Sequence, residues 1–294
     1  MRVAITGTSG FVVDALVPYL KKNQTWEVKT ISVRGDTLDF RGTDVLVHVA
    51  GLIPGKEKCN DEYYQVNFEL TKKICELAKN QGVGQFVYFS TIAVYGSVPR
   101  TKSAEGFFDV LESPSTPYGE SKLFAEKAIL RLQDEKYKVS ILRVPDVYGE
   151  KNIDYLQRYI NIMNKYKHFL INPRVYEDCK RSAIHIDNLC SCVESVIQTK
   201  WGGIMIPHDA EPLSTFEYVT LLAEMYHIIL IPSRLAGSFI KLVNRITGKF
   251  EFFYGRFDAS LDRDESLEYQ IISARDGCKK ALNEFQPDHK SYEN

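Results

Sequence analysis

The sequence predicts an α/β fold, in which a doubly wound parallel sheet is followed by a smaller C-terminal region. Up to about residue 150, short β-branched runs alternate with helical patterns, which favours a parallel sheet covered by helices on both faces. The runs are continuously apolar, as suits strands buried on both faces. A glycine-containing turn follows the first run. Right-handed crossovers then place the ligand crevice at the carboxyl ends of the strands.

Five strands and three helical segments are expected in this first part. The strands are Arg2–Thr6, Val28–Val33, Asp44–Val49, Phe86–Thr91 and Val139–Val144. Between them, apolar side chains recur at helical spacing in stripes that begin at Phe11, Val66 and Phe124. Each stripe can pack on the sheet and leave the opposite helix face in solvent.

After about residue 150 the alternation loosens. Lys151–Cys179 is rich in Tyr, Asn and Lys, and is followed by a strand-like Gly203–Pro207 and by helical patterns at Ser214–Tyr226 and Arg234–Ile246. We therefore expect one domain over residues 1–150, joined by part of 180–207, and a second, smaller region over most of residues 151–294.

The composition is that of an ordinary globular protein. The 294 residues carry a formal net charge of -1, which gives no general attraction to nucleic acid or to an anionic membrane. The six cysteines lack the paired CxxC spacing of a zinc site, and neither His185 nor His208 has a second His or Cys at ligand spacing, so no metal is expected. The longest apolar stretch, near Ile228–Ile231, is too short to span a bilayer. The sequence begins directly with a strand-like run, and we expect a cytoplasmic protein.

The turn after the first strand carries Gly7 and Gly10, with Ser9 and Phe11 beside them. Glycines there permit a tight turn, and they let backbone N–H groups approach a pyrophosphate at the helix N-terminus. The third position of this fingerprint, usually glycine, is Val13. An oversized side chain there costs about 1–3 kcal/mol unless the helix shifts outward. An ordinary strand–helix turn is the alternative.

A second motif places Tyr118 and Lys122 four residues apart, after a potential N-cap at Thr116 and a favourable first-turn Pro117. This spacing puts both side chains on one helix face. A free phenol titrates near 10, and a neighbouring ammonium favours the phenolate, so we expect Lys122 to lower the pKa of Tyr118. A solvated helix face is the alternative.

The third motif is a hydroxyl, Thr91, at the carboxyl end of a buried strand. It can hydrogen-bond a substrate oxygen beside the tyrosine. A threonine that caps the next turn is the alternative interpretation.

In this order and on these elements, the three motifs resemble those of the extended short-chain dehydrogenases, in the NAD-dependent epimerase/dehydratase family that acts on nucleotide sugars. The resemblance covers nearly the whole chain and implies a Rossmann-type fold. It makes residues 1–150, joined by part of 180–207, the dinucleotide-binding domain, and residues 151–294 mainly a substrate-binding region. It implies that Thr91 is the catalytic Ser/Thr and contacts substrate, that Tyr118 is the acid/base, and that Lys122 is its partner. Tyr118 and Lys122 would also contact the cofactor.

The resemblance extends to further binding segments. His48-Val49-Ala50-Gly51 resembles the strand end that passes under the cofactor, and Asn67 matches the asparagine that opens the next long helix. Val144 and Pro145 resemble the segment beside the nicotinamide.

On the substrate side, Arg181 lies in a segment whose arginine often meets the substrate diphosphate, and Arg256 is a second candidate for the phosphates. Asp146 stands where the family often has an asparagine that touches this diphosphate. A carboxylate there would repel a diphosphate unless it turns away or is paired.

The cofactor is expected to be NADP, with NAD possible. NAD-binding relatives usually carry an acidic residue at the end of the second strand, where this chain has Ser32, with Arg34 just beyond. A guanidinium there can pair with a 2′-phosphate. The connection Arg34–Thr43 is shorter than in many members, so Asp36 and Leu38 are the expected rest of the adenine wall. The alternative leaves Arg34 in solvent and gives the ribose to Asp36.

The expected reaction is hydride chemistry at a sugar carbon, most simply C4, of a nucleoside-diphosphate sugar, as a 4-ketoreductase or a 4-epimerase. Thr91 is followed by Ile92 and Ala93 without a carboxylate, which disfavours a dehydratase. The alternative of another class is a non-catalytic dinucleotide-binding regulator on the same fold. The resemblance also implies polysaccharide precursor synthesis, and a homodimer on the helices near Asn67–Lys79 and Tyr118–Leu132, with Ile74 and Phe124 as contact candidates.

Overall fold

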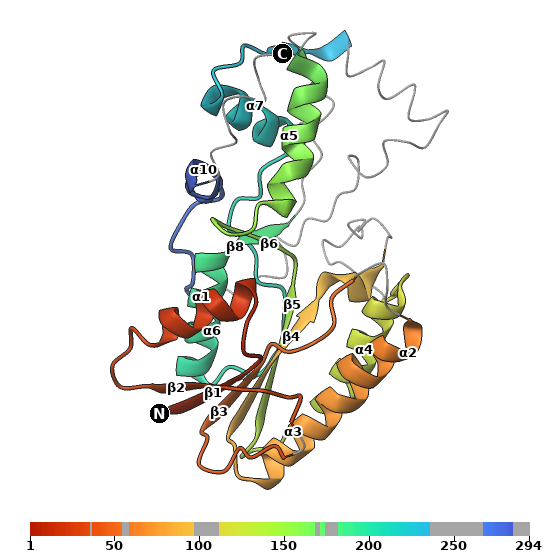
Figure 1. The fold of residues 1–294 in the computed structure, drawn as a ribbon, viewed down its shortest axis with the longest axis vertical. Coiled ribbons are helices and arrows are strands. Elements are labelled where there is room, and N and C mark those ends of the chain that lie inside the picture. Colours follow the sequence, from red (N-terminus) through yellow and green to blue (C-terminus); the bar gives the residue numbers. More distant parts are fainter. Residues whose placement is uncertain are drawn as a thin grey trace, which may run out of the picture.

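Figure 1 shows a computed structural model of the chain, which describes residues 1–35, 37–54, 59–96, 112–167, 171–173, 182–235 and 267–284. Its centre is a parallel sheet of six strands in the order β2-β1-β3-β4-β5-β9. The strands are β1 Arg2–Thr6, β2 Glu27–Ile31, β3 Val45–His48, β4 Gln85–Thr91, β5 Lys138–Val144 and β9 Gly203–Met205. The predicted α/β fold with a parallel sheet is therefore confirmed.

Strand register places the motif-bearing ends on one edge of the sheet. Thr6 at the end of β1 pairs with His48 at the end of β3, and Thr91 at the end of β4 pairs with Val144 at the end of β5. The chain runs from β1 outward to β2 and then returns to the other side of β1 as β3. This reversal is the point at which doubly wound sheets open a ligand crevice.

Helices cover both faces of the sheet (Figure 1). On one face, α1 (Phe11–Leu20) and α6 (Ile186–Thr199) pack together over a core that includes Leu16 and Val193. On the other face lie α3 (Thr71–Asn80) and α4 (Pro117–Leu130), whose Ala78 and Ile129 pack against β4 and β5.

The helix expected from Val66 onward starts earlier than its apolar stripe. The short α2 (Asn60–Tyr63) leads into a π-helical stretch, η1 (Tyr64–Leu70), and then directly into α3. Asn67, in the π-helical stretch, is fully buried.

A second core lies beyond the carboxyl edge of the sheet. It is built from α5 (Asp154–Lys167), α7 (Thr215–Met225) and α10 (Ala274–Glu284). Two small parallel pairs accompany them: β6 (Asp146–Tyr148) with β8 (Ala183–His185), and β7 (Ile171–Pro173) with β10 (Ile231–Ser233). The centre of this second core is aromatic, and the rings of Tyr159 and Tyr218 stack there with their centroids 4.2 Å apart.

The strand predicted at Gly203–Pro207 is present as β9, which ends at Met205 and pairs with β5. Most of the predicted helix Arg234–Ile246 lies outside the described residues. The division at residue 150 stays a prediction. Among the described helices, none combines the length and the apolar character needed to cross a bilayer.

Candidate active site

A cavity of about 260 Å³ opens at the carboxyl edge of the sheet, between β3, β4, β5 and the start of α4. Seven of the predicted residues line it: Val49, Gly51, Thr91, Tyr118, Lys122, Val144 and Pro145. The structure thus brings the three motif side chains to one place, together with the predicted wall of the cofactor site.

The start of α4 is held against the turn that follows Thr91. The Thr116 hydroxyl accepts a hydrogen bond from the Gly119 N–H at 3.1 Å, so the predicted N-cap is confirmed, with Pro117 in the first turn. A Cβ on Gly119 would lie only 2.5 Å from the carbonyl oxygen of Ala93. Glycine therefore permits the close backbone approach that puts Tyr118 beside Thr91.

Thr91 serves two contacts. Its hydroxyl accepts a hydrogen bond from the Ala93 N–H at 3.2 Å, which is the capping role of the alternative interpretation, and its side chain also hydrogen-bonds to Tyr118. The capping bond fixes the hydroxyl beside the phenol. Capping and orientation of a reacting oxygen are therefore compatible in this turn.

The pKa of Tyr118 differs from the expectation. Burial raises it above the ordinary value for tyrosine, the hydrogen bond with Thr91 opposes this, and Tyr63 adds to the rise. The expectation that Lys122 lowers this pKa was wrong, because removal of water is the largest effect and Lys122 is not among the groups that shift the pKa of Tyr118. The phenol therefore carries its proton at neutral pH.

Lys122 is buried at the base of the cavity, with 4% of its surface exposed. Its ammonium donates to the carbonyl of Phe89 at 2.9 Å and lies 4.7 Å from the centre of the Tyr88 ring. Burial lowers its pKa to about 8, and the negative charge of Glu126 opposes this shift. The helical spacing predicted the shared face of Tyr118 and Lys122 but not this burial.

The glycine turn has the backbone geometry that the sequence indicates. Gly7 and Gly10 have φ angles of 101° and 121°, which disfavour any residue with a Cβ. Ser9 is exposed and Phe11 is half-buried at the start of α1. Val13 is buried in the core, and its nearest atom is 3.4 Å from a Cβ placed on Gly7, an ordinary contact. The cost expected for Val13 is thus avoided, because Gly7 leaves room for it.

Asn67 holds the loop after β3 without lining the cavity. Its side-chain oxygen accepts from the Leu52 N–H at 2.7 Å, and its nitrogen donates to the Leu52 carbonyl at 3.0 Å. A Cβ on Gly51 would come within 3.0 Å of the Asn67 oxygen and 3.3 Å of the Lys122 nitrogen. The Ala50 N–H donates to the Thr6 hydroxyl at 3.3 Å.

The end of β2, where cofactor choice was expected, is open to solvent. Ser32 and Arg34 are both exposed, and the Ser32 hydroxyl accepts from the Arg34 N–H at 3.3 Å. Leu38 is half-buried against the core beneath α3. Asp36 lies outside the described residues.

Asp146 is paired, which removes the objection to a diphosphate nearby. Its carboxylate lies 3.4 Å from the guanidinium of Arg158 on α5, which also stacks over the Tyr155 ring at 4.7 Å. Arg181 and Arg256, the other predicted substrate residues, lie outside the described residues.

Six further residues line the cavity but were not predicted. They are Val12, Leu52, Ile53, Phe89, Ser90 and Val147. Each lies one or two positions along the sequence from a predicted residue. Extending every predicted strand end by one or two residues would have found them.

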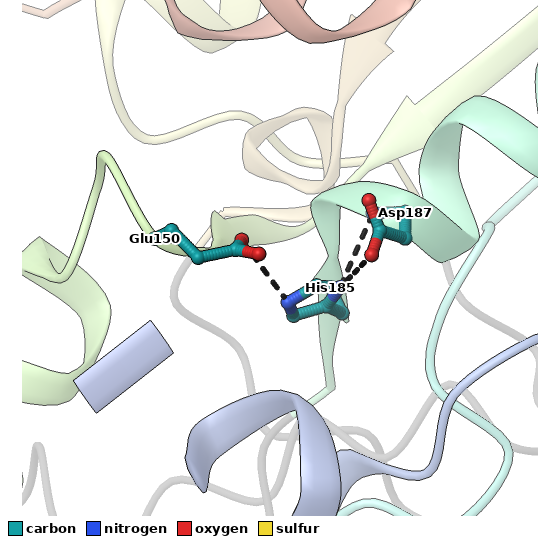
Figure 2. Close-up of side chains that lie close together, drawn as sticks. All are labelled: Glu150, His185 and Asp187. Carbon is teal, nitrogen blue, oxygen red and sulfur yellow. Dashed lines mark hydrogen bonds and ion pairs between the residues drawn. The ribbon is translucent and has the colours of Figure 1, made fainter. Parts of the chain in front are cut away.

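Figure 2 shows a buried histidine and two carboxylates that gather around the start of α6. His185 lies 3.7 Å from both Glu150 and Asp187, with donor atoms that could hold a metal. The ammonium of Lys280 on α10 contacts both carboxylates at 2.6 Å, however, and His185 Nδ1 accepts from the Asp187 N–H at 3.2 Å. Burial lowers the pKa of His185. Lys280 thus already pairs with both carboxylates of this cluster. The expectation that the protein holds no metal stays a prediction.

The family comparison agrees with this geometry. The model of the NAD dependent epimerase/dehydratase family matches residues 3–204, more than half of the chain. The chain belongs to this family. Its glycine turn, Thr91, Tyr118 and Lys122 all lie within the matched part.

The similarity to individual proteins is low in sequence and higher in structure. A UDP-glucose 4-epimerase from Yersinia pestis is 34% identical over 33% of this chain, a match that spans only 30% of that relative. A UDP-glucose 4-epimerase from Vibrio cholerae is 27% identical over 75% of this chain and 74% of its own. Among solved structures, RMD from Pseudomonas aeruginosa with NADPH is 19% identical, with a TM-score of 0.70 over 98% of this chain and 100% of that one. UDP-glucuronic acid 4-epimerase from Bacillus cereus, in complex with UDP-glucuronic acid and NAD, is 21% identical, with a TM-score of 0.68 over 97% of this chain and 98% of that one.

Proposed function

We propose that the protein carries out nicotinamide-dependent hydride chemistry at C4 of a nucleoside-diphosphate sugar, in the first place as a 4-epimerase. The observation that carries this proposal is that Thr91, Tyr118 and Lys122 line one cavity at the carboxyl edge of the sheet. The matched relatives from Yersinia pestis and Vibrio cholerae are UDP-glucose 4-epimerases, which supports the epimerase outcome.

The residues present fit a nicotinamide dinucleotide. The glycine turn leads into α1 without a side-chain cap, so backbone N–H groups at this helix end are available to a pyrophosphate. Gly51 leaves a space between Asn67 and Lys122 that a Cβ would fill. When bound, the cofactor supplies a carrier that accepts and returns two electrons.

Three side chains handle the sugar oxygen and its proton. Tyr118 carries a proton at neutral pH, so it can donate to a forming alkoxide, and its phenolate takes the proton in the opposite direction. Thr91 orients the oxygen through its hydroxyl. Lys122 supplies positive charge at the base of the cavity and a donor for the cofactor ribose.

Epimerisation and net reduction at C4 would use the same three side chains. A 4-ketoreductase is the second candidate, favoured by Ser32 and Arg34, which put no acidic side chain at the end of β2. We propose NADP as the preferred cofactor because the Arg34 guanidinium can pair with its 2′-phosphate, and a consumable NADPH would in turn favour net reduction. Binding of NAD in many epimerase neighbours argues the other way.

The substrate phosphates are assigned to the region beyond β6. Asp146 is neutralised by Arg158, and Arg181 and Arg256 are the proposed cationic contacts from the sequence. The Bacillus cereus neighbour binds UDP-glucuronic acid, which supports a UDP-sugar as the first ligand to try. A cytoplasmic location and a part in polysaccharide precursor synthesis stay predictions.

A homodimer on the outer surface of η1 and α4 is also proposed. Ile74 is fully buried within its own chain, so its predicted contact role was wrong. Phe124 and Tyr64 remain 42% and 40% exposed, and their rings lie 6.2 Å apart, edge to face. A twofold mate would cover this aromatic pair.

The test is incubation with a panel of UDP- and dTDP-sugars and their 4-keto forms, with NAD or NADPH, following nicotinamide absorbance and product stereochemistry. Interconversion of C4 epimers without net absorbance change supports the epimerase. Oxidation of NADPH with a 4-keto sugar supports the reductase. Tight dinucleotide binding without turnover of any sugar would favour the non-catalytic regulator.

A further inference from the structure

Directly behind Lys122, an arginine and a glutamate form a buried ion pair that no part of the proposed reaction uses. We propose that Glu126 and Arg143 are positioning residues, which join the segments that carry the active site and set the charge of Lys122. The catalytic consequence of this inference rests on the proposed function, whereas the electrostatic part can be measured without a substrate.

The contacts of the pair are extensive. Arg143 on β5 is 5% exposed and Glu126 on α4 is 2% exposed. The Arg143 Nε and Nη2 atoms donate to one Glu126 oxygen, Oε2, at 3.1 and 2.6 Å. Nη1 donates to the Tyr95 hydroxyl at 2.7 Å, and Nη2 also contacts Glu112. A charged group buried so deeply is tolerated only with such compensation.

These partners belong to segments that carry the site. Ser90, which donates to Glu126, precedes Thr91. Tyr95 ends the turn that Gly119 packs against, and Arg143 precedes Val144 in the cavity wall. Glu126 lies two helical turns after Tyr118. The ion pair therefore joins β4, the following turn, α4 and β5 at a point beneath the cavity.

Charge balance points to the same role. Two buried cations, Lys122 and Arg143, stand against one buried carboxylate, Glu126, because the half-buried Glu112 pairs with Arg143 and also with the exposed Lys127. Within the described part of the chain, the ion pairs closer than 4 Å do not include Lys122. Its ammonium instead depends on neutral dipoles and on Glu126 one turn away.

The other groups that face Lys122 cannot supply that negative charge. His48 on β3 has its pKa lowered to about 3, by burial and by Lys122, so it is neutral. Burial raises the pKa of Tyr88 on β4 and of Tyr118 on α4, so both are neutral phenols. Asn67 carries no charge. Glu126 is thus the carboxylate that keeps Lys122 protonated, while Arg143 competes for its charge.

The experiment follows the titration of Lys122 by ¹³Cε NMR in the full chain labelled at lysine Cε, with the resonance assigned by its loss in Lys122→Arg. In wild type the expected midpoint is about 8. Glu126→Gln should lower it by about one pH unit, because the ammonium loses its buried counter-charge. Arg143→Gln should raise it, because Glu126 then faces Lys122 without a competing cation. Glu126→Asp should restore most of the wild-type value.

The matched control is Glu150→Gln, which removes another ion-paired carboxylate away from the cavity and should leave the midpoint unchanged. Shifts of opposite sign in the Glu126 and Arg143 variants are not produced by loss of packing. A folded Glu126→Gln or Arg143→Gln protein with the wild-type midpoint overturns the inference. If Glu126→Gln does not fold, the Arg143→Gln variant tests the inference: a raised Lys122 midpoint supports it, and an unchanged or lowered midpoint overturns it.

Turnover provides the catalytic readout. On a sugar that the panel identifies, the fall of kcat at alkaline pH should move to lower pH in Glu126→Gln by the shift that NMR records. An unchanged alkaline limb overturns the positioning role in catalysis. If no sugar is turned over, the proposed function fails. The NMR titration still decides whether Glu126 and Arg143 set the pKa of Lys122.

Discussion

The centre of the cavity and the end of β2 are built in opposite ways. Around Lys122, side chains are buried, hydrogen-bonded and held by backbone contacts closer than a Cβ would allow. Around Ser32 and Arg34, the side chains are exposed, and the Ser32 hydroxyl accepts a hydrogen bond from the Arg34 backbone N–H. Proton transfer needs positions fixed to fractions of an ångström, whereas recognition of one ribose substituent needs only a charge within reach. Changes at the centre should therefore affect turnover, and changes at the β2 end should affect cofactor choice.

The largest effect is expected for Tyr118→Phe. Loss of the hydroxyl removes the proton donor, so turnover should fall by roughly 10²–10⁴-fold. The ring and its packing remain, so the dissociation constant of the cofactor should stay nearly the same. Steady-state kinetics and cofactor titration measure both quantities. A variant that retains more than about a tenth of wild-type turnover removes Tyr118 from its role.

A smaller loss is expected for Gly119→Ala, which tests the backbone contact. The added Cβ would meet the Ala93 carbonyl and push the start of α4 away from Thr91, so kcat should fall by on the order of 10²-fold. The matched control is Gly84→Ala, whose Cβ would meet its nearest atom at 3.5 Å and should leave kcat unchanged. Equal kinetics of the two variants would show that the approach of α4 is not needed.

The burial of Lys122 should also be visible in stability. Its pKa falls from 10.5 to about 8 in the folded protein, so between these values the unfolded chain binds more protons and stability rises with pH. Lys122→Met removes this penalty. It should stabilise the fold by about 1–3 kcal/mol below pH 8, and the gain should disappear as the pH approaches 10.5.

Denaturant unfolding across this pH range measures the effect, with the exposed Lys73→Met as control. A destabilised Lys122→Met variant at neutral pH would mean that the ammonium's contacts outweigh its burial.

The smallest effect is expected at the β2 end. Arg34→Ala should weaken NADP(H) binding by about tenfold, because one charge-assisted hydrogen bond contributes about that much to affinity. NAD(H) binding should stay unchanged. Cofactor titrations of both proteins provide the numbers. Tighter binding of NAD(H) than of NADP(H) by wild type, or an unchanged NADP(H) affinity in the variant, contradicts the assignment.

The same contrast separates what the sequence predicted from what it did not. Short-range patterns located Thr91, Tyr118 and Lys122, because strand ends and helical spacing are local properties. The contact of Gly119 with Ala93 and the pairing of Asp146 with Arg158 join distant segments, so no local pattern contains them. The pKa of Tyr118 was mispredicted because spacing describes a neighbouring charge but not the removal of water.

Helix α5 was missed for a different reason. Its buried face is carried by Tyr155, Leu156, Tyr159, Ile160 and Met163, within a segment otherwise rich in Asn and Lys. Tyrosine occurs both inside and outside proteins, so tyrosines at helical spacing indicate a buried helix face less strongly than an aliphatic stripe does. The structure shows that these tyrosines form the centre of the second core.

The central claim is transfer of a hydride from C4 of a nucleotide sugar, with the proton handled by Tyr118. The most direct measurement is incubation of wild type and Tyr118→Phe with a UDP-hexose that carries deuterium at C4, followed by mass spectrometry and NMR. Wild type is predicted to move the deuterium to the opposite face of C4 or to the nicotinamide ring, while Tyr118→Phe leaves it in place. Loss of the deuterium to water, or equal transfer by both proteins, would contradict the account.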